Sequence, residues 1–381
     1  MTPAPDPLFD LARDVLPQWP RRMDHPIGVV GAGFIVRDVQ LVAYREAGFR
    51  VAAIASRTPA HARAAAAAGN VPLVHDTVAE LLADPGIEIV DIAVPPRVQL
   101  EVVREAVRHP HLKGILAQKP LAPTLGEAAE IVRLCEAAGV VLAVNQNMRF
   151  DHGIRALRTL LTRGDLGDPV LATIEMRAVP HWQDYLAGEE RLTLLNMSIH
   201  HLDAFRFLFG EPERVFASAR TDPRTSFAHR DGIALYVLEY ASGLRAAAWD
   251  DVWAGPDDAA RDDHIRWRVE GTAGIAQGTV GWPSFPAREP STIDVALRGG
   301  GWQRPRWPYA WFPDAFAGPM ASLMRAIEDG GTVEDVDGRD NLGTMALVEA
   351  CYRSLDEHRA ITPVRLSRCR TPSPPAPPTS R

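Results

Sequence analysis

Cysteine is scarce in this chain, with only 3 in 381 residues. Cys135, Cys351 and Cys369 lie far apart in the sequence. Such spacing suits neither a disulfide framework nor the paired ligands of a zinc knuckle. We therefore expect reduced thiols, as in a cytoplasmic protein, and no bound metal.

Long apolar runs and clusters of positive charge are also missing. No run approaches the roughly 18–20 apolar residues that span a bilayer. The first seven residues, Met-Thr-Pro-Ala-Pro-Asp-Pro, lack the basic start and apolar core of a signal peptide. The formal net charge is −7, from 41 Lys and Arg against 48 Asp and Glu. We expect no binding to nucleic acid or to a membrane surface.

What the chain does contain is enough for two ordinary globular domains. Its length is 381 residues, of which 46% are hydrophobic and 23% charged. These are typical globular values, and the length exceeds what a single core usually serves.

A glycine-containing turn follows the first apolar run. Residues 27–30 read Ile-Gly-Val-Val and lead into Gly31-Ala32-Gly33, and a second apolar run ends in Ser56 and Arg57. This order of strand, glycine turn, helix and strand is typical of a dinucleotide-binding βαβ unit. Gly31 allows the tight turn, and Gly33 lets the backbone approach a pyrophosphate at the positive end of the helix. Val36 stands where a third small residue is usual. The alternative to a dinucleotide-binding turn is an ordinary strand-to-helix turn with no ligand.

Strands and helices alternate over the first part of the chain. Apolar runs at 29–30, 51–55, 73–74, 89–94, 114–117 and 140–144 alternate with helical patterns at 37–47, 59–68, 77–83, 98–108 and 124–138. Buried strands separated by helices favour a parallel, doubly wound sheet. We predict a dinucleotide-binding Rossmann domain at 26–148, preceded by a loosely held arm at 1–25.

The pattern changes after about residue 150. Strand-like stretches at 170–179, 233–240, 244–252, 264–270 and 292–298 follow with few intervening helices, and helices are expected at 152–163, 198–208, 314–328 and 339–357. This order predicts an α+β substrate and oligomerisation domain at 149–365, with an open, mainly antiparallel sheet. The Pro-rich residues 366–381 are expected to be a disordered tail.

Two groups of residues are candidates for proton chemistry. Lys119 follows a predicted strand, at the sheet edge where such folds bind ligands, and its amine suits a substrate hydroxyl. His200 lies four residues after Asn196 and three before Asp203, so a helix would place all three on one face. A carboxylate and an amide beside an imidazole can fix its tautomer. The bland alternatives are a surface lysine and a helix cap with a surface histidine; His200 and Asp203 also suit a metal, but no third ligand is evident.

Polar residues at other strand ends are candidates for binding. The stretch 145–150 holds three amides and Arg149, which suit a hydroxyl-rich ligand or satisfy a domain junction. The loop at 94–99 would line a nicotinamide pocket or form an ordinary Pro-rich turn. Trp182 stands among polar residues and is a candidate for stacking on a sugar ring, although most such aromatics belong to a core.

Taken together, these motifs resemble the glucose–fructose oxidoreductase/inositol dehydrogenase (Gfo/Idh/MocA) family over about residues 26–365. The resemblance depends on the order Gly31-x-Gly33, Val94-Pro95-Pro96, Gln118-Lys119-Pro120, Asn145 to Arg149, and His200-x-x-Asp203. It implies a Rossmann domain, a second domain whose open sheet mediates dimers or tetramers, and NAD(P)-dependent oxidation of a hydroxyl on a sugar or cyclitol.

The resemblance also implies residue roles. The family's Lys, here Lys119, contacts substrate and cofactor, and its proton-exchanging His is His200, with Asp203 as support. By the same resemblance, further residues would bind cofactor or substrate. The cofactor set is Gly31, Gly33, Phe34, Ile35, Ser56, Arg57, Pro95, Gln99, Gln118, Lys119 and Asn147; the substrate set is Lys119, Asn147, Arg149, Trp182, His200 and Asp203.

Three departures from the family pattern stand beside these motifs. Gln118 replaces the Glu of Glu-Lys-Pro, and Asn196 and Ser198 replace the Asp and Gly before the histidine. Pro96 and Gln99 replace the family's Asn and His. Amides in place of carboxylates keep hydrogen bonding but alter the pKa values of the neighbouring lysine and histidine.

The end of the second strand bears on the choice of cofactor. An acidic residue there usually binds the ribose hydroxyls and repels a 2′-phosphate, whereas Ser56 and Arg57 suit a phosphate. We therefore expect NADP or NAD, with NADP favoured. The leading hypothesis is a sugar or polyol dehydrogenase; the alternatives are transient use of bound NAD for epimerisation, oxido-isomerisation or glycosidic cleavage, and a non-catalytic dinucleotide sensor.

Overall fold

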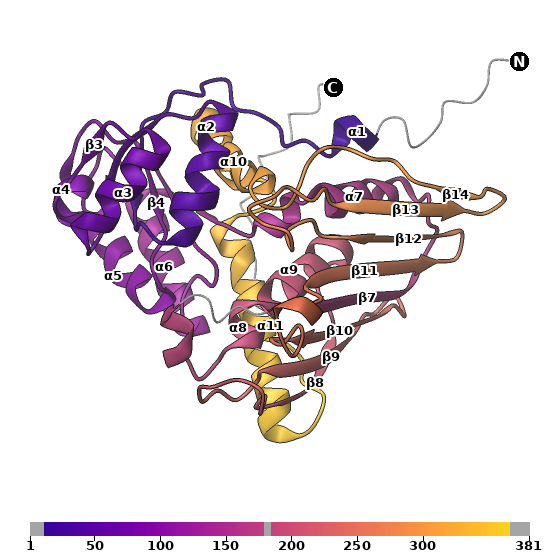
Figure 1. Cartoon of the computed structure of the whole chain (residues 1–381). Helices are drawn as coiled ribbons and strands as arrows, with labels where there is room; N and C mark the ends of the chain where they lie inside the picture. Colours follow the sequence, from indigo (N-terminus) through magenta and orange to yellow (C-terminus); the bar gives the residue numbers. More distant parts are fainter. Residues whose placement is uncertain (1–10, 179–183, 366–381) are drawn as a thin grey trace, which may run out of the picture.

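The computed structural model describes residues 11–178 and 184–365. Two sheets stand side by side, one covered by helices on both faces and one on a single face (Figure 1). Within these residues no helix combines the length and apolarity needed to cross a bilayer. Cys135 and Cys351 are both buried and free, and Cys369 lies outside the described residues.

The first sheet is fully parallel and has six strands in the order β3-β2-β1-β4-β5-β6. Its strands are β1 (Ile27–Val30), β2 (Val51–Ala55), β3 (Leu73–Val74), β4 (Ile89–Ile92), β5 (Gly114–Ala117) and β6 (Val141–Val144). Its helices are α2 (Leu41–Ala47), α3 (Pro59–Gly69), α4 (Val78–Ala83), α5 (Pro96–Ala106) and α6 (Leu125–Ala138). The expected doubly wound sheet is confirmed. The strand order reverses between β1 and β4, so a ligand crevice is expected at their carboxyl ends.

The turn after β1 departs from a regular helix start. A π-helical turn, η1 (Ile35–Gln40), precedes α2. Gly31 has a φ of +117°, and a Cβ there would lie 2.1 Å from the carbonyl oxygen of Ala93, so glycine is required. A π-turn contains one extra residue and is often found at functional sites. Gln40, the last residue of this turn, is buried.

The second sheet has eight strands in the order β14-β13-β12-β11-β7-β10-β9-β8. They are β7 (Pro169–Arg177), β8 (Arg214–Arg220), β9 (Ile233–Glu239), β10 (Arg245–Asp251), β11 (His264–Gly271), β12 (Gly274–Thr279), β13 (Thr292–Leu297) and β14 (Trp302–Gln303). All its pairs are antiparallel except β7 with β10. The expected open, mainly antiparallel sheet is confirmed, although β8, β12 and β14 were not predicted.

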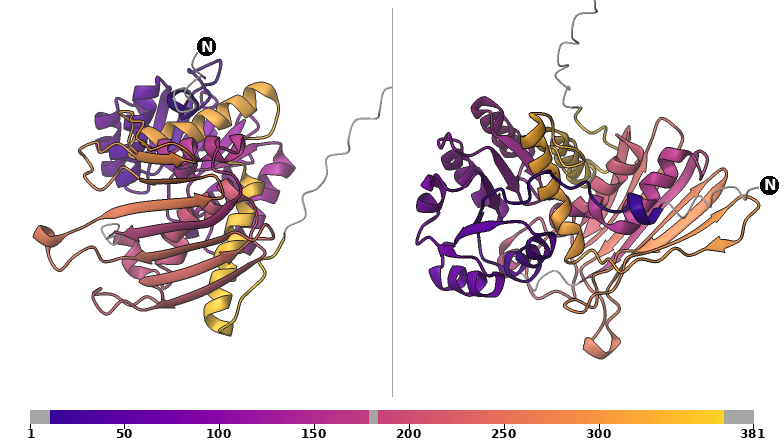
Figure 2. Two further views of the ribbon diagram at one scale, coloured as in Figure 1. Left: turned by 90° about the vertical axis from the view of Figure 1, so that its right-hand side faces the viewer. Right: turned by 90° about the horizontal axis from the view of Figure 1, so that it is seen from above.

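Helices cover only one face of this second sheet. They are α7 (His152–Arg163), α8 (Thr193–Asn196), α9 (Ser198–Phe209) and α11 (Gly338–Glu357). The left view of Figure 2 looks onto the other face, where no helix of the described residues lies. Large apolar side chains are exposed along its strands, among them Phe216, Leu235 and Trp249.

The chain's final helices return to the first sheet. Helix α10 (Ala317–Asp329) packs on β5 and β6, and α11 packs on α6 as well as on β8 and α9. The predicted boundary at 148/149 falls in a 3-10 turn, η2 (Asn147–Phe150). Helices α10 and α11, which belong to the second part of the chain, thus pack on strands and a helix of the first part.

The described part of the N-terminal arm, residues 11–25, is packed rather than loosely held, which corrects the expectation. Helix α1 (Leu11–Asp14) contacts α7, and Leu11 and Val15 are fully buried. The Arg21 and Arg22 backbone N–H groups donate to the Glu328 carboxylate at 2.9 and 2.7 Å. The sequence did not indicate that residues 11–25 are packed, because single apolar residues in a Pro- and Arg-containing segment give no periodic signal.

Candidate active site

A cleft of about 580 Å³ lies at the carboxyl ends of the first sheet's strands, facing residues of the second part of the chain. Ligand pockets commonly fall in this size range. Most of the predicted site residues line it, from both halves of the sequence. They are Gly31, Gly33, Phe34, Ile35, Ser56, Arg57, Pro95, Gln118, Lys119, Asn147 and His200.

The glycine turn leaves room for a phosphate group. A Cβ at Gly33 would meet no atom within 4 Å, so the backbone faces open space in the cleft. Backbone N–H groups at a helix start attract anions. The residues at this turn therefore fit a dinucleotide pyrophosphate.

The end of β2 places positive charge at the same cleft. Ser56, Arg57 and Thr58 line it, together with His61 from the first turn of α3. Arg57 is exposed and makes no ion pair within the described residues. His61 was not predicted, although its position five residues after Ser56, on the same segment, could have indicated it.

Lys119 follows β5 and is held by a contact with the second half of the chain. Its Nζ donates a hydrogen bond to the backbone oxygen of Asn196 at 2.7 Å, which joins the two halves of the chain. Burial lowers the pKa of Lys119 from 10.5 to about 7. A lysine amine with such a pKa exchanges its proton readily near neutral pH.

Gln99 does not line the cleft, which corrects its assignment as a cofactor-binding residue. It is fully buried, and its Nε2 donates to the backbone oxygens of Gln118 at 3.0 Å and of Pro120 at 2.8 Å. Gln99 therefore fixes the backbone on both sides of Lys119.

A buried carboxyl group lies behind Gln118. The Gln118 Nε2 donates to Gln40 Oε1 at 3.2 Å, and Gln40 Nε2 donates to Asp91 Oδ2 at 2.7 Å. Tyr44 Oη also donates to Asp91 Oδ2 at 2.7 Å. Burial raises the pKa of Asp91 to about 7. Sequence reasoning missed this network; the signal was an Asp inside the apolar run 89–94.

His200 reaches the cleft from α9 on the opposite side. His200 is 3% exposed, and its buried Nδ1 has no hydrogen-bond partner among the described residues. Burial lowers its pKa well below 6.5, with further contributions from Lys119 and His201. The imidazole is therefore neutral at physiological pH and able to accept a proton.

The neighbouring histidine has the carboxylate partner expected for His200. His201 Nδ1 lies 2.9 Å from Asp250 Oδ1 on β10, away from the cleft lining. Asn196 accepts a hydrogen bond from Tyr185 Oη at 3.3 Å. No group of three His, Cys, Asp or Glu side chains within the described residues is placed to hold a metal ion.

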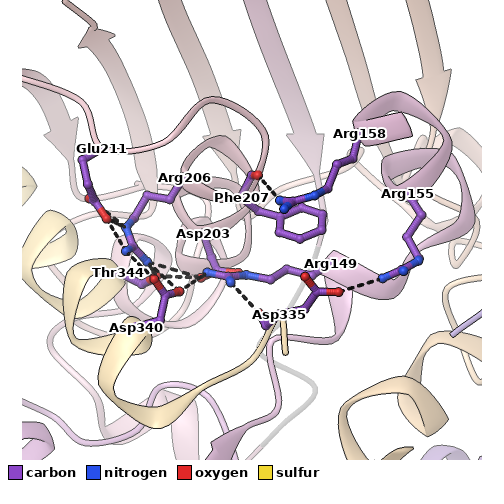
Figure 3. Close-up of polar contacts among 10 residues, drawn as sticks. All are labelled: Arg149, Arg155, Arg158, Asp203, Arg206, Phe207, Glu211, Asp335, Asp340 and Thr344. Atoms are coloured by element: carbon purple, nitrogen blue, oxygen red, sulfur yellow. Dashed lines mark hydrogen bonds and ion pairs between the residues drawn. The ribbon is translucent and has the colours of Figure 1, made fainter. Parts of the chain in front are cut away.

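Arg149 and Asp203 do not line the cleft, which corrects their assignment to substrate binding. The Arg149 guanidinium makes two hydrogen bonds of 2.6 Å to Asp203 and one of 2.9 Å to Asp340 (Figure 3). Both members of the pair are at most 5% exposed. Thr344 and Arg206 complete the cluster around α9 and α11. A residue whose charge and donors are already satisfied in this way has nothing to offer a substrate.

Trp182, also assigned to substrate binding, lies outside the described residues. Several aromatic side chains in the cleft were not predicted as site residues. Trp282, Trp311, Phe312 and Phe316 line it from the segment between β12 and α10. They form an apolar part of the cleft wall.

Sequence comparisons find two matching family models. One, described as an oxidoreductase family with an NAD-binding Rossmann fold (GFO_IDH_MocA), matches residues 26–146. The other, a GFO/IDH/MocA C-terminal domain, matches residues 154–277. Together they cover the whole first sheet and strands β7 to β11 of the second.

Individual relatives match over most of the chain. D-apiose dehydrogenase of Paraburkholderia graminis is 30% identical over 344 residues, which cover 87% of this chain and 88% of the relative. The 1,5-anhydro-D-fructose reductase of Ensifer adhaerens is 30% identical over 84% of this chain and 92% of its own. An oxidoreductase from Agrobacterium radiobacter, solved in complex with NAD+, L-tartaric acid and magnesium, has a TM-score of 0.75 at 25% identity, covering 88% of this chain and 98% of its own.

Proposed function

Because the chain belongs to the Gfo/Idh/MocA oxidoreductase family, we propose that it is an NAD(P)-dependent sugar or polyol dehydrogenase or reductase. The substrate is a sugar, sugar acid or cyclitol that reacts at a secondary hydroxyl. The observation that supports this proposal most is that Lys119 and His200, from the two halves of the sequence, line the same cleft as the glycine turn. A fold by itself does not specify a reaction, but these two groups provide proton transfer next to a dinucleotide site.

The residues of the glycine turn and of the end of β2 would hold the dinucleotide, whose nicotinamide would supply the hydride exchange with the substrate carbon. Neutral His200 takes the hydroxyl proton, and Lys119 Nζ donates a hydrogen bond to the same oxygen. Nδ1 of His200 is buried, so Nε2 is the nitrogen that exchanges the proton. Because a charged Lys119 lowers the pKa of His200, the two groups share one positive charge rather than both carrying one.

NADP is the cofactor that the end of β2 favours. Ser56, Arg57 and His61 can surround a 2′-phosphate, and no acidic side chain lines the cleft there to repel it. Isothermal titration should give a lower Kd for NADPH than for NADH. Tenfold tighter binding of NADH would contradict this preference.

Net oxidation or reduction is favoured over the alternative uses of this fold. The relatives described above are named as a dehydrogenase and a reductase, and not as epimerases or sensors. An enzyme that uses its cofactor transiently keeps it bound and releases no reduced nicotinamide during turnover. Stoichiometric formation of NAD(P)H from added NAD(P)+ distinguishes the two.

The experiment that tests the proposal is a substrate panel. The purified protein is assayed with NAD+ and NADP+ against D-apiose and other aldoses, cyclitols and sugar acids, and in the reverse direction with 1,5-anhydro-D-fructose, by nicotinamide absorbance. Turnover of at least one hydroxyl compound is the expected result. No turnover of any compound with either cofactor would contradict the proposal.

The open face of the second sheet fits a homo-oligomer, which we propose as a dimer or tetramer. Its exposed apolar side chains include Phe216, Leu235, Val237 and Trp249, each at least 38% exposed. Contiguous apolar patches of this kind mark interaction surfaces. In light scattering, the wild type should give an oligomer and Trp249→Asp a smaller species. We also propose that the protein works in the cytoplasm.

A further inference from the structure

Resting on this proposed function, we propose that Trp311 is a positioning residue for the reaction: it holds the His200 ring from one side and sets the orientation of the Asn147 amide. Trp311 lies between β14 and α10, in a segment with no assigned role. It is 2% exposed and lines the cleft. Three observations carry the proposal.

The first concerns what orients His200. Catalytic imidazoles usually have a partner that fixes the ring, most often a carboxylate. Here Asp203 binds Arg149, and Asp250 binds His201 and Ser198. In the part of the chain that the structure describes, Nδ1 of His200 has no hydrogen-bond partner. Packing must therefore hold the ring.

The second observation is the packing itself. The centroids of the His200 and Trp311 rings are 5.2 Å apart with an interplanar angle of 90°, an edge-to-face pair. Trp311 is in turn held by Phe312 at 4.8 Å and by its backbone N–H, which donates to Gly281 at 2.9 Å. The indole is thus a rigid wall against the imidazole.

The third observation is the direction of a hydrogen bond. The Trp311 Nε1–H donates to Asn147 Oδ1 at 2.8 Å. An indole nitrogen only donates, so the oxygen of the amide must face Trp311 and its NH₂ group must face elsewhere. The Asn147 Nδ2 donates one hydrogen bond to Asn145 Oδ1 at an N···O distance of 3.3 Å, and its second hydrogen remains for the cleft. Asn147 therefore offers a donor, which suits a substrate oxygen.

The indole also excludes water from His200. The groups whose charge acts on this ring are Lys119 from the end of β5 and the adjacent His201. The carboxylates nearby are bound by partners of their own, Asp203 on α9 by Arg149 and Asp250 on β10 by His201. Removing the indole admits water without changing any of these charges.

Two substitutions separate the two roles. Trp311→Phe keeps an aromatic ring against His200 but removes the N–H, and Trp311→Leu removes the ring as well. Trp307→Phe is the matched control, because Trp307 lies in the same segment, is 6% exposed, does not line the cleft, and has an indole N–H without a partner.

The first readout does not depend on activity. The His200 ring is titrated by NMR, with its signal assigned from its loss in His200→Asn. In the wild type, Trp311→Phe and Trp307→Phe the ring should titrate well below its usual pKa, and in Trp311→Leu it should titrate closer to the usual 6.5 or so. An unchanged titration in a folded Trp311→Leu protein would overturn the positioning of His200.

The second readout uses whichever substrate the panel identifies. Trp311→Phe should raise the substrate KM about fivefold, the value of one hydrogen bond, with kcat within twofold. Trp307→Phe should leave both unchanged. An unchanged KM in Trp311→Phe would overturn the role at Asn147. If no compound of the panel reacts, the proposed function fails while the NMR titration still decides the role of Trp311.

Discussion

Replacing Arg149 with methionine distinguishes a structural ion pair from a substrate ligand. Methionine keeps most of the apolar stem and removes the charge. The change breaks the paired hydrogen bonds to Asp203 and the bond of 2.9 Å to Asp340. Asp203 keeps Thr344 as a donor at 2.6 Å and Arg206 at 4.0 Å.

The expected loss of stability follows from burial. Removing one partner of a buried ion pair costs about 3–5 kcal/mol, because the other charge remains buried. The remaining partners of Asp203 place this case near 3 kcal/mol. For a chain of 381 residues the entropy of unfolding near the transition is about 0.8 kcal/mol per kelvin, so Tm should fall by about 4 °C.

The assay is differential scanning calorimetry combined with steady-state kinetics. Arg149→Met should lower Tm and leave the substrate KM within about threefold at 25 °C. The control, Arg353→Met, removes an exposed pair with Glu357 and should shift Tm by less than about 1 °C. An Arg149→Met protein with unchanged Tm and a KM raised tenfold or more would refute the reasoning, because it would place Arg149 on the substrate.

Three further changes test other parts of the account. Lys119→Met should raise Tm at pH 6–7, and this gain should disappear as the pH approaches the normal lysine pKa of 10.5. Because the pKa of Lys119 is about 7 in the folded state, the unfolded state binds more protons between pH 7 and 10.5, so the stability of the wild type rises with pH over this range. A gain in Tm that does not depend on pH in calorimetry would contradict this prediction. Gly31→Ala should yield little soluble protein, since its Cβ would meet the Ala93 oxygen at 2.1 Å with φ at +117°; a wild-type Tm would refute this. Ser56→Asp should weaken NADPH binding at least tenfold relative to NADH, as measured by titration calorimetry.

The sequence predicted the first sheet more fully than the second for a physical reason. Strands β1 to β6 are apolar, apart from Asp91 in β4, and are separated by helices, so each stands out. In the second sheet only one face is buried, and β8, β12 and β14 carry Arg, Gln, Gly or Ser at alternate or end positions. Their strand character comes from pairing with neighbours rather than from composition.

The site was predictable where it follows from strand ends, and not where it follows from contacts between distant segments. Lys119 and the glycine turn lie at the edge that any doubly wound sheet uses. Helical spacing correctly placed His200 and Asp203 on one helix, but it could not show that the Asp203 carboxylate forms an ion pair with Arg149. Trp311 lies more than a hundred residues from His200 and reaches it only through tertiary packing.

The measurement that tests the central claim most directly is turnover by Lys119→Met and His200→Asn, each compared with its own affinity for cofactor. If the amine and the imidazole both act on the substrate oxygen, each variant should lose at least about a hundredfold in kcat while its cofactor Kd stays within about threefold. Wild-type turnover in both variants would contradict the account.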